Sequence, residues 1–272
     1  MDLEALKGKA NDIRIDIVKM VAEAGSGHPG GSLSSADILC ALYFEVLKHD
    51  PAHPDDPARD RFVLSKGHAA PVLYATLAEA GYFPTEELQT LRKLGSRLQG
   101  HPDCRKLPGV EVSTGSLGQG LSIAAGMACG LKMEGSASRV FALLGDGECQ
   151  EGQVWEAAMF AAHRGLDNLV AIVDHNHLQI DGNIADVCSP ESLVDKFAAF
   201  GWTVLSCNGN DMADVLGTLR DAESRLGDGK PVAIVAETTK GKGVSYMEGQ
   251  AGWHGKAPNA EQAARALEEL GA

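Results

Sequence analysis

Apolar residues recur along the chain with the spacing of amphipathic helices, and glycine- and proline-rich turns separate these segments. The patterns predict helices over residues 11–24, 36–48, 151–165 and 259–270. The glycine-rich segment 25–31 ends the first helix, and Ser34 or Ser35 can cap the second. The third helix is expected to end at Gly165 and to bury one face, which carries Val154, Trp155, Ala158, Met159 and Ala162.

Five short apolar runs have the character of buried strands. They cover residues 62–64, 140–144, 169–173, 203–205 and 232–236. None alternates strictly between apolar and polar residues, which is typical of parallel strands covered on both faces. The helix between the second and third runs completes a β-α-β unit. Residues 1–272 are therefore predicted to form one α/β domain, a doubly wound and mostly parallel sheet flanked by helices.

The composition excludes several classes of function. The chain has 272 residues and a formal net charge of −13, which argues against nucleic acid or an anionic membrane as a partner. No apolar stretch reaches the length of about 18 residues that a membrane span needs, and the N-terminus lacks the apolar segment of a secretory signal. The six cysteines form no CxxC pair. We expect reduced cysteines that serve as packing residues in a cytoplasmic protein.

The strongest chemical signal lies where two predicted strands end. The run 140–144 leads into Gly145, Asp146 and Gly147, and the run 169–173 leads toward Asn176. If the strands are neighbours, a carboxylate and an amide oxygen meet at one sheet edge and suit Mg²⁺ or Ca²⁺. Gly147 would let phosphate oxygens approach backbone N–H groups. Taken alone, the same residues also fit an ordinary turn followed by a loop.

Five ordered motifs show a resemblance to a known family. They are Ser26-Gly-His-Pro-Gly-Gly31, Ser65-Lys-Gly-His68, Gly100-His-Pro102, Ser113-Thr-Gly-Ser-Leu-Gly-Gln-Gly120, and Lys240-Gly-Lys-Gly-Val-Ser245 with Trp253-His-Gly255. Together with the aspartate and asparagine above, they cover nearly the whole chain. The sequence resembles the N-terminal half of a transketolase, the half that binds thiamine diphosphate.

The resemblance implies how the cofactor is held. Asp146 and Asn176 would bind a divalent cation through their side chains, and Leu178 would bind it through its backbone carbonyl. The cation would be Mg²⁺, with Ca²⁺ or Mn²⁺ as alternatives. Gly147 and His68 would approach the diphosphate of the cofactor.

The resemblance also implies roles around the rest of the site. Gly115 and Leu117 would present backbone groups to the aminopyrimidine side of the cofactor. Glu151 would belong to a glutamate cluster at a subunit interface, although a carboxylate at the start of a helix is favoured in any case. Three histidines would line the substrate channel: His28, His101 and His254. Ser116 replaces a proline that is common in the family.

The other titratable residues leave alternatives open. A lone histidine is usually a structural polar residue, but four lie beside glycine in turns, which favours a functional role for His28, His68, His101 and His254. We expect structural roles for His49, His53 and His163. Lys240 and Lys242 fit either a solvated face or a loop that closes over the site. His175 and His177 differ from the commoner family residues, and their effect on the metal site is open.

The resemblance implies that this chain transfers a two-carbon ketol unit from a ketose to an aldose, with sugar phosphates as substrates, as in the pentose phosphate pathway. The chain ends before the pyrimidine-binding domain that completes the site in this family. We therefore expect its partner to be a separately encoded C-terminal subunit, in an α2β2 assembly. The alternatives are a sulfosugar transketolase, an E1-like thiamine enzyme and a non-catalytic cofactor-binding subunit.

Overall fold

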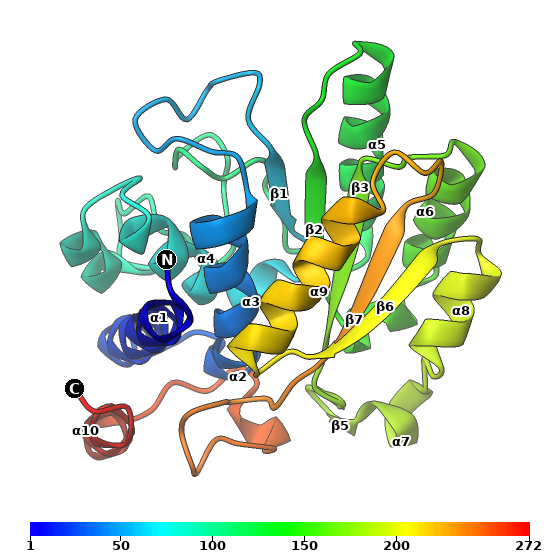
Figure 1. Ribbon diagram of the computed structural model, residues 1–272. Helices are drawn as coiled ribbons and strands as arrows, with labels where there is room; N and C mark the ends of the chain where they lie inside the picture. The colour runs from blue at the N-terminus through cyan, green and yellow to red at the C-terminus, as the bar shows by residue number, and fades with distance from the viewer.

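The computed structural model describes residues 1–272 and contains a central sheet of five parallel strands (Figure 1). The strands follow the order β1-β2-β3-β7-β6 across the sheet. Their bounds are Arg61–Leu64 for β1, Val140–Gly145 for β2, Leu169–His175 for β3, Thr203–Asn208 for β6 and Val232–Glu237 for β7. All five predicted strands and the parallel α/β fold class are therefore confirmed. A short antiparallel pair, β4 (Leu178–Gln179) and β5 (Gly182–Asn183), follows β3.

Helices cover both faces of the sheet, as Figure 1 shows. Their bounds are Leu3–Ala24 (α1), Pro29–Ser34 (α2), Ala36–Ala41 (α3), Ala70–Glu79 (α4), Gln119–Met133 (α5), Gly152–His163 (α6), Ile184–Cys188 (α7), Leu193–Ala199 (α8), Met212–Ser224 (α9) and Ala260–Glu269 (α10). None of them combines the length and the apolar character that crossing a membrane requires.

Each strand contributes alternate side chains to two separate apolar cores. In β3, Val170 and Ile172 join the larger core, which α1, α3, α4 and α9 cover. Ala171 and Val173 point the other way, into a smaller core beneath α5, α6 and α8. The sheet is therefore buried on both faces, which explains why its strands are continuous apolar runs.

The predicted helix boundaries need several corrections. The first helix begins at Leu3, well before residue 11. The segment 36–48 is not one α-helix, because α3 ends at Ala41 and a π-helical turn continues over Leu42–Val46. A separate helix, α2, begins at Pro29, whose fixed backbone suits the first helical turn. Neither predicted serine caps a helix through its side chain. The Ser34 hydroxyl instead bonds to Asp174 at 2.6 Å.

Two predictions about packing are partly wrong. Met159 is 61% exposed, because the buried face of α6 runs through Val154, Ala157, Ala158 and Ala161. All six cysteines are free, but Cys104 and Cys188 are exposed and do not pack in a core. Cys104 lies in a surface turn, and Cys188 is the last residue of the short helix α7.

Candidate functional site

A cavity of about 320 Å³ opens beyond the carboxyl ends of β2 and β3, where ligands bind in parallel sheets. Because the two strands pair in parallel register, Gly145 lies opposite Asp174, and the residues that follow both strands meet at this edge. The predicted cofactor and metal residues all line the cavity: His68, Gly115, Leu117, Asp146, Gly147, Asn176 and Leu178. Of the predicted catalytic residues, Glu151 and His254 line it, whereas His28 and His101 do not.

Asp146 is the most deeply buried carboxylate in direct contact with this cavity, at 2% exposure. One oxygen accepts a hydrogen bond from its own neighbour, the Gly147 N–H, at 2.7 Å. The other accepts from the His177 N–H at 2.5 Å. Burial, together with the nearby charge of Asp174, raises the pKa of Asp146 to about 6. Asp146 forms no ion pair with any side chain. A bound cation would therefore compensate its buried charge.

Asn176 and Leu178 supply two further oxygens beside Asp146. The Asn176 amide donates to Asp174 at 3.0 Å, while its oxygen accepts from the Leu178 N–H at 3.2 Å. The Leu178 carbonyl accepts from the Lys240 ammonium at 2.9 Å. A carboxylate, an amide oxygen and a carbonyl form an all-oxygen donor set, which suits a hard cation such as Mg²⁺. The contact with the Lys240 ammonium shows that the Leu178 carbonyl can face a positive charge.

Lys240 lies inside the site. For this lysine, the structure favours a loop that closes over the site rather than a solvated face. It is buried, and burial lowers its pKa to about 8. Its ammonium also lies 3.0 Å from the His254 Nδ1. Lys242, in contrast, is partly exposed and pairs with Glu248 at 3.3 Å. Only the first of the two lysines therefore faces the cavity.

A buried ion pair between Lys66 and Asp174 lies at the base of the site. The sequence analysis did not predict this pair. The Lys66 ammonium lies 2.5 Å from Asp174, and their side chains are 2% and 0% exposed. The ammonium also donates to the Gly31 carbonyl at 2.9 Å and to the Ser35 hydroxyl at 2.6 Å. Although burial opposes ionisation, Lys66 and the bound hydroxyls lower the pKa of Asp174. The pair therefore fixes the ends of β1 and β3 to the helix after the first glycine-rich turn.

Glu148 is a second buried charge that sequence reasoning missed. Its carboxylate accepts from the Ser65 hydroxyl at 2.5 Å, from the Gly118 N–H at 2.9 Å and from the Gly145 N–H at 3.1 Å. Burial raises its pKa despite these bonds. Glu148 therefore joins three of the segments that surround the cavity. Its place directly after Gly147 was the available signal.

The four histidines that lie beside glycine come together at one side of the cavity. The ring centre of His28 lies 5.2 Å from that of His68, 5.5 Å from His254 and 6.4 Å from His101. Burial lowers the pKa of His28 to about 4 and that of His254 to about 3, with nearby cationic side chains adding to the effect. Burial also lowers the pKa values of His68 and His101. At neutral pH all four rings are therefore uncharged, and each offers one donor and one acceptor.

In two of these rings, the hydrogen-bond partners show which nitrogen atom is free to bind a ligand. Lys240 is a donor, so its contact makes the His254 Nδ1 an acceptor and leaves the proton of that ring on Nε2. The His28 Nδ1 is buried and has no hydrogen-bond partner within the chain. Because buried polar atoms are normally satisfied, this nitrogen points to a ligand or water as its partner.

The remaining predicted residues lie at the rim. Gly115 has a φ of +148°, and a side chain there would come within 2.9 Å of the His101 ring. A Cβ on Gly147 would lie 2.9 Å from the Gln179 Cβ, so packing alone already requires glycine there. Glu151 is exposed and precedes α6 without capping it through its side chain. Leu117 is 37% exposed beside it.

Comparison with known proteins agrees with this geometry. The family model described as "Transketolase, thiamine diphosphate binding domain" matches residues 6–272. One of the subunits of the apulose-4-phosphate transketolase of Phocaeicola vulgatus is 46% identical over 270 residues, which are 99% of this chain and 95% of that protein. A 6-deoxy-6-sulfo-D-fructose transketolase subunit of a Clostridium species is 45% identical and covers 97% of this chain and 96% of its own length.

Full-length transketolases match the chain over less than half of their length. The human enzyme is 42% identical over 269 residues, which are 98% of this chain but 42% of that protein. The crystal structure of transketolase from Campylobacter jejuni superposes with a TM-score of 0.93 at 37% identity and covers 100% of this chain and 43% of that one. The family resemblance predicted from the sequence motifs is thereby confirmed. The chain belongs to the transketolase family of transferases and carries its thiamine diphosphate-binding domain.

Proposed function

We propose that this chain is the cofactor-binding subunit of a two-subunit transketolase, which transfers a two-carbon ketol unit between sugars. The observation that carries the proposal is the meeting of Asp146 and Asn176, from two strand ends, in one cavity beside four uncharged histidines. The relatives that match over nearly their full length are transketolase subunits, which supports the same function.

Asp146, Asn176 and the Leu178 carbonyl would hold the divalent cation, with Mg²⁺ as the expected ion and Ca²⁺ or Mn²⁺ as substitutes. The buried, uncompensated charge of Asp146 supports this assignment. Gly147 and His68 would contact the diphosphate, while Gly115 and Leu117 would face the aminopyrimidine side. Thiamine diphosphate, when bound, supplies the electron-accepting ring on which a carbon–carbon bond next to a carbonyl is cleaved. The protein binds and orients the cofactor and the substrate, and it excludes water from them.

The histidines would form hydrogen bonds to the sugar substrate. His28, His101 and His254 are neutral at pH 7. His28 and His101 can each donate to one hydroxyl and accept from another, whereas His254 can only donate, because its Nδ1 accepts from Lys240. The unpartnered Nδ1 of His28 and the protonated Nε2 of His254 are the two atoms best placed for such contacts. Sugar phosphates are the expected substrates. A sulfonated sugar is the second candidate, because one relative of similar length is named for that substrate.

A partner subunit would complete the site. The cavity leaves Leu117 at its rim open to solvent, and three further exposed apolar side chains, Met133, Met159 and Phe160, lie on α5 and α6. Exposed apolar surface of this kind is typical of interaction faces. We expect a second copy of this chain and the pyrimidine-binding subunit to cover it in an α2β2 assembly, with Glu151 at the interface.

Calorimetry of thiamine diphosphate binding in the presence and absence of Mg²⁺ tests the proposal. The wild-type chain should bind the cofactor only with the metal, and Asp146→Ala should weaken this binding by about 100-fold or more, because a ligand to the cation is lost. Asp186→Ala is the matched control, since this exposed aspartate on α7 lies outside the cavity. Equal affinity of the Asp146→Ala and control variants would remove the metal assignment.

An activity assay separates the alternatives. Ketol transfer should require both this chain and a pyrimidine-binding partner, whereas full activity of this chain alone would contradict the two-subunit proposal. Cofactor binding without transfer, even with the partner present, would identify a non-catalytic subunit. Turnover of 2-oxo acids in place of ketoses would identify an E1-like enzyme.

A further inference from the structure

Two histidines and a glutamate form a compact cluster beside the cofactor site but outside its cavity. His175 ends β3 and lies opposite Glu237, the last residue of β7, in parallel register. The His175 Nδ1 lies 2.6 Å from one Glu237 oxygen, and the His177 Nε2 lies 2.8 Å from the other. Potential ligand atoms of all three residues lie within 4.8 Å of one another. A single metal ion could therefore bind all three after a modest adjustment of their side chains.

The cluster is separate from the Lys66–Asp174 pair because side chains alternate along a strand. Asp174 points to the face covered by α2, where Ser34 binds it. His175, one residue later, points to the opposite face, where it contacts Glu191 in the segment before α8. The two histidines flank Asn176 in sequence, yet neither side chain lines the cofactor cavity.

Glu191 gives the cluster the organisation of a metal site. It accepts from the His175 Nε2 at 2.6 Å, on the side of the ring away from Glu237. Metal-binding histidines commonly donate their second nitrogen to a carboxylate, which fixes the tautomer and the orientation of the ring. Because carboxylates only accept, the metal-free His175 donates from Nδ1 to Glu237 and from Nε2 to Glu191. A metal that binds at Nδ1 would displace the proton there and leave the bond to Glu191 in place.

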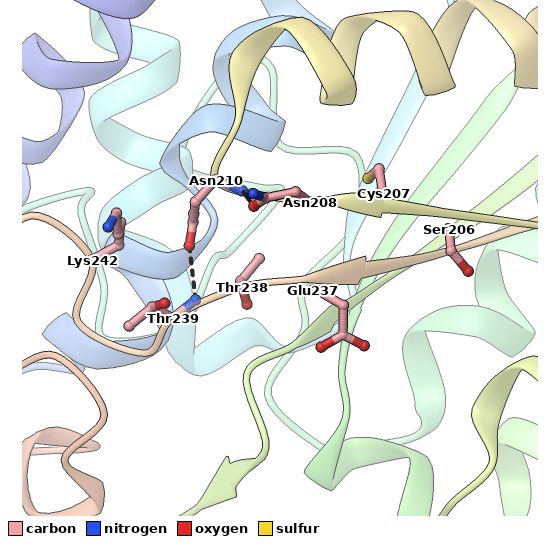
Figure 2. Close-up of a pocket in the computed structure, with 8 residues that line it drawn as sticks. All are labelled: Ser206, Cys207, Asn208, Asn210, Glu237, Thr238, Thr239 and Lys242. Carbon is pink, nitrogen blue, oxygen red and sulfur yellow. Dashed lines mark hydrogen bonds between the residues drawn. The ribbon is translucent and has the colours of Figure 1, made fainter.

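The cluster also has room to take up an ion. Ligand atoms around a tetrahedral Zn²⁺, about 2.1 Å from the metal, lie about 3.4 Å apart. The two hydrogen-bonded contacts therefore need to open by less than about 1 Å, while wider pairs need to close to the same spacing. The side chains of His177 and Glu237 are 48% and 53% exposed and can make this movement. Figure 2 shows the Glu237 carboxylate directed away from Asn208 and Asn210, and this residue borders an open hollow of about 600 Å³. Solvent can therefore supply the fourth ligand.

We propose that His175, His177 and Glu237 bind a divalent transition metal of the Zn²⁺ class at a second site, distinct from that of the cofactor's cation. Imidazole nitrogen is a preferred ligand of Zn²⁺ and Co²⁺, whereas Mg²⁺ prefers oxygen and competes poorly here. A bound metal would tie the ends of β3 and β7 to the loop that carries Asn176 and Leu178. It would thereby stabilise the segment that holds the cofactor's cation.

Titration of the metal-free chain with Zn²⁺ and Co²⁺, in excess Mg²⁺ and without thiamine diphosphate, tests this proposal. We expect one Zn²⁺ per chain and visible Co²⁺ absorption typical of nitrogen and oxygen ligands. His177→Gln and Glu237→Gln should each weaken Zn²⁺ binding by at least about tenfold, and Glu191→Gln by about tenfold. All three residues are partly exposed or on the surface, so these variants are expected to fold.

The controls distinguish binding at the proposed site from binding elsewhere on the chain. His53→Gln removes an exposed histidine that pairs with Asp50 far from the cluster, and it should leave Zn²⁺ binding unchanged. Saturating thiamine diphosphate and Mg²⁺, added afterwards, should also leave it unchanged, because the cofactor's cation site is a different one. Binding that survives both His177→Gln and Glu237→Gln would overturn the proposal, as would thiolate-to-Co²⁺ charge-transfer absorption, which would place the metal on cysteines. Loss of Zn²⁺ binding when thiamine diphosphate and Mg²⁺ are added would assign the Zn²⁺ to the cofactor site and overturn the proposal.

Discussion

Asp174 and Asp146 are two buried carboxylates at the ends of neighbouring strands, and the protein treats them in opposite ways. Asp174 is surrounded by an ammonium from Lys66 and by donors from Ser34, Asn176 and Thr238. Asp146 receives hydrogen bonds only from backbone N–H groups. Both side chains are almost inaccessible to solvent.

The difference separates a structural charge from a binding charge. A buried charge is stable only when it is paired and hydrogen-bonded, and the contacts of Asp174 meet that condition within the chain. Asp146 lacks a cationic partner, so it keeps its full attraction for an external cation. The chain thus contains one completed ion pair and one incomplete pair at the same sheet edge.

The largest expected effect comes from removing the cation that Asp174 already has. Lys66→Met should lower the free energy of unfolding by about 3–5 kcal/mol, because it leaves a buried carboxylate without its partner. Urea denaturation measures this change. Lys93→Met is the matched control, since Lys93 forms a half-exposed ion pair with Glu23 and should lose less than about 1 kcal/mol. Equal losses for the two variants would show that Asp174 does not depend on Lys66.

Glu148 tests whether the loops around the cavity depend on buried charge in general. Glu148→Gln should cost about 2–3 kcal/mol, because its carboxylate accepts three hydrogen bonds and an amide offers only one acceptor oxygen. Urea denaturation measures the loss, with the exposed Glu156→Gln on α6 as control. A loss no larger than that of the control would mean that Ser65 and Gly118 find other acceptors.

Asp16, on α1, is another carboxylate without an ion-pair partner, and one of its oxygens is buried with no hydrogen-bond partner. Burial and the neighbouring Glu79 raise its pKa to about 7, above the ordinary value of 3.8. The folded state then binds the proton more tightly than the unfolded state, so stability falls as pH rises from about 4 to about 7.

Asp16→Asn should remove this pH-dependent loss. After allowance for solvent screening, we expect the variant to gain about 1–2 kcal/mol over the wild type at pH 8 and almost nothing at pH 4. Thermal unfolding at the two pH values measures the gain. A gain of the same size at both values would mean that ionisation of Asp16 is not its cause.

The smallest expected effect is on Asp146 itself. Asp146→Asn should change the free energy of unfolding by less than about 1 kcal/mol when metal and cofactor are absent. An amide can accept only one of the two backbone hydrogen bonds, but removal of a buried charge that burial and Asp174 destabilise offsets this loss. Urea denaturation in a chelating buffer measures this change. A loss comparable to that of Lys66→Met would contradict the contrast between the two carboxylates.

The sequence predicted the sheet well because its strands are short, continuous apolar runs, and their order along the chain follows from the β-α-β pattern. It also placed Asp146 and Asn176 correctly at one edge, because residues that follow parallel neighbouring strands must meet. The roles of these residues stay proposals until binding is measured.

The interior contacts of the site could not be predicted in the same way. The pairing of Lys66 with Asp174 joins segments that are far apart in the sequence and depends on which face each strand residue takes. The same alternation brings His175 against Glu237, although nothing local links them. The burial of Met159 was misjudged because helical spacing fixes the width of an apolar face but not its orientation over the sheet.

The most direct test of the central claim is a crystal structure of this chain with Mn²⁺ and thiamine diphosphate, in which anomalous scattering locates the metal. We expect one Mn²⁺ bonded to the side-chain oxygens of Asp146 and Asn176 and to the Leu178 carbonyl, with the Lys240 ammonium displaced from that carbonyl. Cofactor bound with its metal on other ligands, or with no metal near Asp146, would contradict the account.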